Sequence, residues 1–422
     1  MSSGKRLFAL SLTTLAAAVA SATAHAGTVT SDGQDLVIKT KGGLEVGTVD
    51  KTFTFKVGGR LQLDYDVYED VFHKSGVGAD ADNIAYTGSA DSLYFRRSFL
   101  EFSGTVNTDW KYVMNLAIDT DKSTAIWDEA HIDYVGFAPV TIKLGKYEAD
   151  FGLEHATSSK WITAIERSMV LDVGGWQTAK QYGGQVSATG GMLYGSLGLF
   201  QNDDSLAHDG KHSYAYVARA VIAPINEAGR VLHFGLDYAH RNSRETSQSV
   251  KTSMAVKKAD AITLGTNETA KEDDVFMIEA AYAMGPLSAQ AEYINRNLDG
   301  GNDGDLESAE GYNVQVAYTL TGEARGYKLD GGKFDAVKPA GARGAYEVFY
   351  RFDNASGEVK AATGNPEATV HTVGMNWYAN ENVKVALNYL MSATDNVVSD
   401  SAKAAGSKDD GNAISARLQY AF

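Results

Sequence analysis

The chain has 422 residues, of which 53 are acidic and 38 are basic, and it contains no cysteine. Without cysteine there can be no disulfide, no thiolate metal site and no cysteine nucleophile. A net charge of -15 at pH 7 argues against a nucleic-acid partner.

The first 26 residues read as a secretory signal peptide, 1–26. It has a basic start, an apolar run over 7–20 and the small-x-small pattern "AHA" at 24–26. A membrane-anchoring helix is the alternative, but the run is too short to cross about 30 Å of hydrocarbon, and no later segment has the necessary length. We therefore expect an exported chain that begins near Gly27 and has no transmembrane helix.

Alternation of apolar and polar residues is the main pattern of the remaining chain. Apolar or small residues occupy every second position of 52–68, from Phe53 to Val67, with polar residues between them. This period of two indicates a long two-faced β-strand. The pattern returns in "WKYVMNLAID" at 110–119, "VLHFGLDYAH" at 231–240, "VFMIEAAYAM" at 275–284 and "ISARLQYAF" at 414–422.

Short and long connections alternate between the expected strands. The short ones fall at 107–109, 138–139, 190–191, 224–229, 285–286 and 380–382. The long polar ones fall near 69–92, 148–181, 202–212, 242–273, 298–310, 354–369 and 393–411. One connection, 321–344, is long but lies on the short-turn side. Counting strands between connections gives about sixteen, with both chain ends on the short-turn side.

These patterns predict an all-β transmembrane antiparallel barrel over 51–422. Lipid offers no hydrogen-bond partner, so the sheet must close on itself. Strands of about ten residues, with short turns at one end and long loops at the other, are typical of such barrels. A soluble β-sandwich is the alternative, but it would have to hide all these aromatic-rich faces in one core.

Two adjacent arginines interrupt one strand, "LYFRRSFLEFSG" at 93–104. The apolar positions are odd before Arg96 and Arg97 and even after them. A β-bulge would produce this slip and turn both arginines into the lumen. The alternative leaves one arginine facing lipid, at about 2 to 4 kcal/mol at mid-depth or about 0 to 1 at the interface, where it could snorkel.

Nine segments, in the order in which they occur, carry a resemblance to a known family. They are "GTVTSDGQDLVIKTKGGLEV" at 27–46, "FKVGGRLQLDY" at 55–65, "YFRRSFLEF" at 94–102, "DWKY" at 109–112, "WDEAHIDYVGF" at 127–137, "DFGLEHATSSKWITAIER" at 150–167, "YTLTGEARGYKLDGGKFDAVKP" at 318–339, "NWYANENVKV" at 376–385 and "RLQYAF" at 417–422. They closely resemble the phosphate-selective porins O and P of Gram-negative outer membranes, over essentially the whole mature chain.

The resemblance implies a trimeric channel in the outer membrane, in contact with lipid and lipopolysaccharide, that passes phosphate or polyphosphate into the periplasm. It also implies a constriction lined by arginine and lysine and narrowed by an inward-folded loop. The segment 148–181 is the candidate for this loop, and its "SSKWITAIERS" has helical character. Guanidinium forks match phosphate oxygens, and lysine acts as a mobile point charge.

Candidate pore residues follow from the same resemblance. Arg60, Arg96, Arg97 and Lys111 are carried into the pore, and Lys39 and Lys41 belong to an N-terminal segment, 27–50, on the periplasmic side. The other candidates are Phe99, Glu148, His155, Lys160, Lys251, Lys257 and Lys258. The alternative for each basic residue is a structural role in a salt bridge of the lumen. The alternation of side chains along the strands places roughly a dozen basic and about ten acidic side chains there.

Several residues depart from the family pattern. Lys251, Lys257 and Lys258 lie in 242–273, where phosphate-specific members have an arginine-rich ladder. Glu148 and His155 stand where such members have a neutral or acidic residue and a lysine. Phe99 lacks the hydroxyl of the tyrosine that can occur there, as in the polyphosphate-type variant. A general diffusion porin with a weak anion preference therefore remains the alternative.

Other functions have weaker support. An outer-membrane hydrolase would need converging catalytic residues, but the nine histidines are scattered, with no HExxH or GxSxG motif. An adhesin would be a barrel without ion-selective conductance. The acidic "LDGGNDGDLE" matches no EF-hand or RTX spacing, so we interpret it as a solvated loop. We expect no cofactor and no metal.

Overall fold

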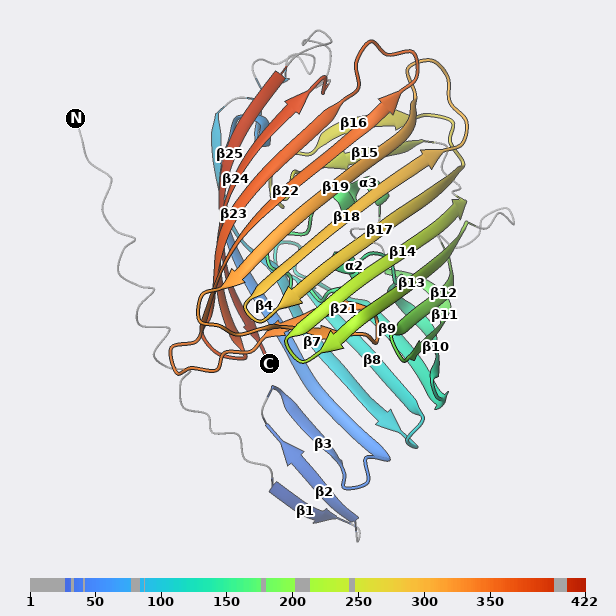
Figure 1. Cartoon of the computed structure of the whole chain (residues 1–422), viewed down its shortest axis with the longest axis vertical. Helices are drawn as coiled ribbons and strands as arrows, with labels where there is room; N and C mark the ends of the chain where they lie inside the picture. The colour runs from blue at the N-terminus through green and yellow to red at the C-terminus, as the bar shows by residue number, and fades with distance from the viewer. Residues whose placement is uncertain are drawn as a thin grey trace, which may run out of the picture.

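The structure is a computed structural model, which describes residues 27–31, 34–40, 42–76, 84–86, 88–175, 180–201, 213–242, 247–397 and 408–422. The expected signal peptide, 1–26, lies outside the described residues. Sixteen antiparallel strands close into one barrel (Figure 1). The all-β barrel predicted from the sequence is therefore confirmed.

The barrel strands are β4 (Phe53–Glu69), β7 (Ser89–Val106), β8 (Trp110–Asp119), β9 (Thr124–Phe137), β10 (Val140–Glu148), β11 (Lys180–Gly190), β12 (Leu193–Gln201), β13 (Tyr214–Glu227), β14 (Arg230–Asn242), β17 (Glu272–Met284), β18 (Leu287–Leu298), β19 (Leu306–Thr319), β22 (Ala345–Val359), β23 (Glu367–Tyr378), β24 (Val383–Asp395) and β25 (Lys408–Ala421). Each pairs with its neighbours around the ring, and β25 returns to β4.

The alternating sequence explains the two faces of this wall. On β14, Phe234, Leu236 and Tyr238 point outward, and 46%, 50% and 46% of their surface is exposed. His233 and Asp237 alternate with them and are buried inside the barrel. An apolar outer face and a polar interior suit a barrel that shows its outer face to lipid.

Most of the described connections lie near the predicted ranges, and three differ. The connection between β22 and β23 is only 360–366, because β22 continues to Val359 and β23 begins at Glu367. The turn between β13 and β14 is only 228–229, because β13 continues to Glu227. The connection between β8 and β9, 120–123, is short although it lies on the long-loop side.

The seam of the barrel joins β25 to the second half of β4, from Ala413 opposite Tyr68 to Ala421 opposite Arg60. Phe422 adds one more pair to it. The Phe422 N–H donates to the Gly59 carbonyl at 3.0 Å, and the Phe422 carbonyl accepts from the Gly59 N–H at 2.9 Å. A side chain at position 59 would meet the Phe422 ring at 2.7 Å, so the glycine makes this close approach possible.

Deletion of Phe422 is expected to reduce the amount of assembled barrel in the outer membrane. The deletion removes the last hydrogen-bonded pair of the seam, together with an aromatic ring in phase with the apolar face. The measurement is the fraction of heat-modifiable protein in outer-membrane preparations. Phe422→Tyr, which keeps the backbone pair and the ring, is the control. Equal assembly of the truncated and wild-type proteins would refute this role of the C-terminal residue.

The segment 27–50 forms a small sheet of β1 (Gly27–Ser31), β2 (Gln34–Lys39) and β3 (Leu44–Thr48). β3 pairs with the first half of β4, with Leu44 opposite Val57. β4 therefore belongs to both sheets, and Figure 1 shows the small sheet beyond the short-turn end of the barrel.

The β-bulge predicted at the arginine pair is confirmed. Across β4 and β7, Gln62 lies opposite Arg97 and Leu63 lies opposite Phe95, so Arg96 is the extra residue. Arg96 and Arg97 both line the interior cavity of the barrel. The alternative, in which one arginine faces lipid, is therefore wrong.

Shorter elements lie between the barrel strands. They are the hairpins β5 (Lys74–Gly76) with β6 (Ile84–Tyr86), β15 (Gln248–Thr252) with β16 (Ile262–Asn267) and β20 (Arg325–Lys328) with β21 (Lys333–Val337), the 3-10 helix η1 (Asp70–Phe72), and the helices α2 (Leu153–Ala156) and α3 (Val170–Gly174). In the part of the chain that is described, no helix is both long and apolar enough to cross a membrane.

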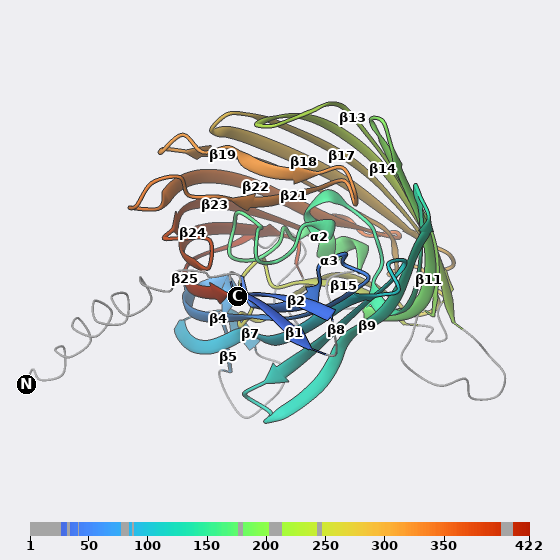
Figure 2. The ribbon, with the colours of Figure 1, turned by 90° about the horizontal axis from the view of Figure 1, so that it is seen from below.

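The described part of the connection 148–181, up to residue 175, folds into the barrel, as predicted. Figure 2 shows α2 and α3 inside the ring of strands. Leu171 of α3 lies in one buried apolar cluster with Met254, Leu264 and Val275. This cluster fixes the connection against the interior of the barrel by burial of apolar surface.

Candidate pore site

A cavity of about 900 Å³ lies inside the barrel. β4 and the strands from β7 to β11 supply most of its wall, while the connections 148–181 and 321–344 supply much of the remainder. The inward-folded segments thus fill part of the lumen and leave a polar cavity on one side.

Eleven basic and eight acidic side chains line this cavity. The basic residues are Arg60, Arg96, Arg97, Lys111, Lys122, Lys143, Arg167, Lys180, Lys257, Lys258 and Lys333, and the acidic residues are Asp119, Asp121, Asp128, Glu129, Asp133, Glu148, Asp150 and Asp330. These numbers of basic and acidic side chains are similar to those expected from the alternation of residues along the strands. The excess of positive charge is small, so the local arrangement of the charges decides what the cavity attracts.

Arg60 and Lys160 share one carboxylate on the wall. Arg60 Nε donates to Glu101 Oε1 at 2.9 Å, and Lys160 Nζ donates to Glu101 Oε2 at 2.9 Å. The guanidinium of Arg60 lies 4.8 Å from the centre of the Phe99 ring, a cation–π distance. Phe99 thus supports the position of Arg60 at the cavity wall.

Arg96 and Arg97 meet a different carboxylate, Glu166 of the inward loop. Arg96 holds it as a fork, with Nε 2.8 Å from Oε1 and NH2 3.0 Å from Oε2. Arg97 NH1 lies 3.8 Å from Oε1 and donates to Gln62 Oε1 at 3.0 Å. The guanidiniums of β4 and β7 are therefore balanced by two separate carboxylates, Glu101 and Glu166.

A third arginine, Arg417 of β25, completes the cluster. Its NH2 donates to Glu166 Oε1 at 2.8 Å. Burial raises the pKa of the Glu166 carboxyl, but Arg96, Arg97 and Arg417 lower it by more and hold it well below its usual range. Glu166 is therefore ionised at neutral pH.

Glu148 and His155 pair with each other across the start of the inward loop. His155 Nε2 lies 2.9 Å from Glu148 Oε1, and Lys180 Nζ donates to Glu148 Oε2 at 3.2 Å. All three residues line the cavity. Glu148 thus offsets the charge of Lys180 at this point of the passage.

Side chains around the barrel hold the backbone of the inward loop. The donor and carbonyl pairs are Gln62 with Ser159, Gln419 with Lys160, Arg325 with Trp161, Lys384 with Ile162, Asn376 with Thr163 and Arg417 with Ile165. The helical character expected for "SSKWITAIERS" is wrong, because these side chains take carbonyls that a helix would use. In the described part of this connection, which ends at residue 175, only the flanking α2 and α3 are helical.

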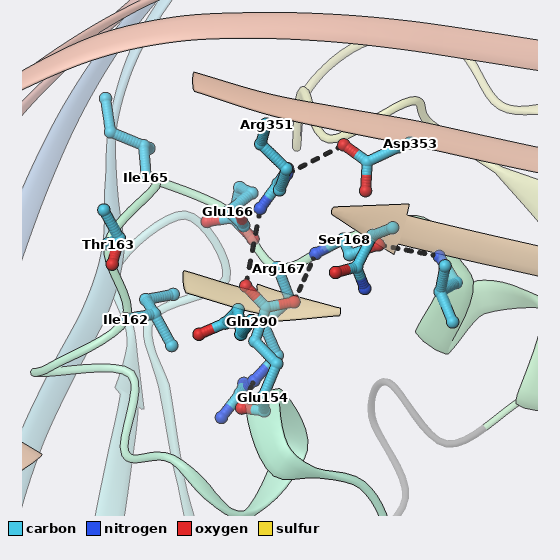
Figure 3. Close-up of polar contacts among 12 residues, drawn as sticks. Glu154, Ile162, Thr163, Ile165, Glu166, Arg167, Ser168, Gln290, Arg351 and Asp353 are labelled. Atoms are coloured by element: carbon cyan, nitrogen blue, oxygen red, sulfur yellow. Dashed lines mark hydrogen bonds and ion pairs between the residues drawn. The ribbon is translucent and has the colours of Figure 1, made fainter. Parts of the chain in front are cut away.

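Glu154 joins the two arms of the loop to the wall (Figure 3). Its Oε2 accepts from the Ser168 N–H at 2.8 Å, and its Oε1 lies 3.4 Å from Arg351 NH1. Arg351 Nε donates in turn to Asp353 Oδ2 at 2.7 Å. This chain of charge-assisted contacts fixes the loop on the side opposite the cavity.

The unusual connection 321–344 also enters the barrel. Arg219 donates to the Gly331 and Gly332 carbonyls at 2.8 and 2.9 Å, and Tyr327 Oη lies 2.7 Å from His233 Nδ1. These contacts hold the connection inside the barrel, where Lys333 lies at the cavity wall. The length of this connection was the only signal in the sequence for its inward path.

Some candidate residues lie away from the cavity. Lys39 pairs with Glu45 at 2.7 Å on the small N-terminal sheet, and Lys41 lies outside the described residues. Lys251 is exposed on β15. Arg60, Arg96, Arg97, Phe99, Lys111, Glu148, His155, Lys257 and Lys258 line the cavity. Lys160 lies beside it, through Glu101.

Arg167 is a cavity residue that the sequence analysis missed. Its Nε donates to the Glu154 carbonyl at 3.2 Å, and its NH2 donates to the His155 and Thr157 carbonyls at 3.3 and 2.9 Å. Neutral carbonyls thus orient this guanidinium toward the cavity. Lys143 was also missed, although its polar position in the alternating strand 140–148 would have indicated an inward side chain.

A closed barrel with an apolar exterior, a charged lumen and an inward-folded loop defines an outer-membrane porin. The family model "Phosphate-selective porin O and P" matches residues 55–422. The chain belongs to this family, and it is a channel protein of the Gram-negative outer membrane, not an enzyme.

A curated relative supports the family, and two solved structures support the fold. The chain is 41% identical to Porin O of Pseudomonas aeruginosa over 95% of this chain and 96% of that protein. OmpT of Vibrio cholerae shares the fold with a TM-score of 0.55 and 12% identity, over 88% of this chain and 98% of that one. An anion-selective porin from Comamonas acidovorans shares the fold with a TM-score of 0.53 and 10% identity, over 88% of this chain and 100% of that one.

Proposed function

We propose that this porin is an anion-selective pore through which phosphate or polyphosphate-type anions diffuse into the periplasm. The observation that carries the proposal is the placement of Arg96 and Arg97 on the cavity wall by a bulge. A bulge places two adjacent guanidiniums on one face, where each can present donors to the oxygens of one anion.

The remaining basic residues support a path with several binding positions. Lys257 and Lys258 line the same cavity as the arginine pair, as do Arg167 and Lys333. Successive basic side chains can replace the hydration of an anion without holding it at one place. A longer anion, such as pyrophosphate, can contact two positions at once and gain from both.

The test is the reversal potential of the purified protein in a planar bilayer under a salt gradient. We expect a potential on the anion-selective side, and block of the chloride current by phosphate and, at lower concentration, by pyrophosphate. A reversal potential on the cation side, or a chloride current insensitive to both anions, would contradict the proposal.

A general diffusion porin with a weak anion preference is the second candidate. The observation that favours it is the pairing of Arg60 with Glu101 and of Arg96 with Glu166, which leaves less positive charge for an anion. This candidate predicts an anion-selective reversal potential without phosphate block. The same bilayer experiment therefore separates the two functions.

We infer that the channel is a homotrimer. A trimer form of OmpT of Vibrio cholerae shares the fold with a TM-score of 0.51 and 13% identity. Chemical cross-linking in outer-membrane preparations should give a ladder that ends at three subunits. A ladder that ends at one or two subunits would contradict this inference.

A further inference from the structure

Glu166 occupies the place of an anion among three arginines. Its carboxylate is bound by Arg96 and Arg417 and lies 3.8 Å from Arg97. We propose that Glu166 is a positioning residue that determines specificity: it occupies the chelating edge of Arg96 and so prevents the arginine cluster from trapping a phosphate-type oxyanion. This inference rests on the proposed function and concerns how fast the anion leaves.

The hydrogen bonds of Arg96 carry the argument. A guanidinium binds an oxyanion best through two parallel N–H groups on one edge. In Arg96 the edge formed by Nε and NH2 is taken by the two oxygens of Glu166, at 2.8 and 3.0 Å. An anion in the cavity can therefore reach only the remaining N–H groups of Arg96, and the contact is weaker than a fork.

Arg417 cannot take the place of Arg96 as a ligand for the anion. Its Nε and NH2 bind the two oxygens of Asp64, both at 2.7 Å, and its NH1 donates to the Ile165 carbonyl. Its contact with Glu166 uses the second N–H group of NH2. Arg417 therefore does not serve as a ligand for the anion. Its role is to hold the Glu166 carboxylate in place.

The backbone around Glu166 is also fixed. The Glu166 carbonyl accepts from Arg351 NH1 at 2.9 Å, and the preceding carbonyl, of Ile165, accepts from Arg417. Wall side chains of β22 and β25 thus hold the backbone at Glu166. Glu166 is thereby held as a ligand of Arg96, and in this position it limits the affinity of Arg96 for a passing anion.

Glu166→Gln is expected to strengthen phosphate binding. An amide keeps the size of the side chain but loses the charge and one of the two acceptor oxygens, so the edge of Arg96 becomes available to phosphate. The phosphate concentration that blocks half of the chloride current should fall roughly tenfold. The current carried by phosphate at saturation should fall, because release is slower, while the chloride current without phosphate is retained.

Three further variants make the test specific. Glu166→Asp keeps the charge on a shorter side chain, and we expect a half-blocking concentration between wild type and Glu166→Gln, even if the latter assembles poorly. Adding Arg96→Met to Glu166→Gln should abolish the gain in affinity. Glu310→Gln makes the same chemical change at an exposed glutamate that accepts from Tyr293 Oη, and should leave the block unchanged.

Unchanged or weaker phosphate block in both assembled Glu166 variants would overturn the inference. The same holds if the combined Arg96→Met and Glu166→Gln protein binds phosphate as tightly as Glu166→Gln alone. These failures are distinct from failure of the proposed function, which would appear as a wild-type channel without anion selectivity or phosphate block.

Discussion

Replacement of Arg96 and Arg97 together by alanine is expected to move the reversal potential toward cations and to weaken the block of the chloride current by phosphate. Both guanidiniums line the cavity, so the substitution removes two positive charges from a lining in which basic residues only modestly outnumber acidic ones. The half-blocking phosphate concentration should rise by roughly tenfold or more, because two charge-assisted donors are lost.

Folding should survive this double substitution. Glu166 loses Arg96 but keeps Arg417 at 2.8 Å, so no isolated charge is left buried. Arg230→Ala, which removes an exposed arginine paired with Glu227, is the control and should leave both electrical measurements unchanged. A wild-type reversal potential and wild-type phosphate block in the assembled double variant would show that the arginine pair does not select anions.

Excision of residues 156–170 is expected to raise the single-channel conductance severalfold and to reduce ion selectivity. This segment crosses the lumen and is held there by side chains of the barrel, from Gln62 on β4 to Lys384 on β24. Its removal takes this loop out of the lumen and so widens the path for ions. Single-channel recordings in planar bilayers measure the effect, and heat modifiability confirms the fold.

The control for this excision is a shortened connection between β22 and β23, at 360–366, whose residues are mostly exposed. It shortens the chain at the same end of the barrel without entering the lumen, so conductance should not change. An unchanged conductance in the correctly folded excision variant would remove the inward loop from the constriction.

The wall of the barrel could be predicted because each strand carries its own signal. On β14, Phe234, Leu236 and Tyr238 alternate with lumen residues, and the other strands repeat this alternation. The reason is that lipid covers one face of the wall and water the other. The bulge was predictable for the same reason: the parity changes by one residue at Arg96, and no distant residue is needed to see it.

The sequence was less informative about the inward loop. Its length indicated an unusual connection, but its composition suggested a helix over 158–168. The structure has none there, because wall side chains bind the carbonyls of residues such as Ile162 and Thr163. A local propensity is outweighed when distant side chains offer the backbone other partners.

The sequence by itself determined the class of this protein: a closed barrel with a charged interior, since the period of two and the alternating connections are local properties. Only the tertiary structure decided which charges neutralise each other. Glu166 lies 70 residues from Arg96 and 251 from Arg417, and no local pattern connects them. Ion pairing depends on distance in space, and closure of the barrel around the inward loop sets those distances.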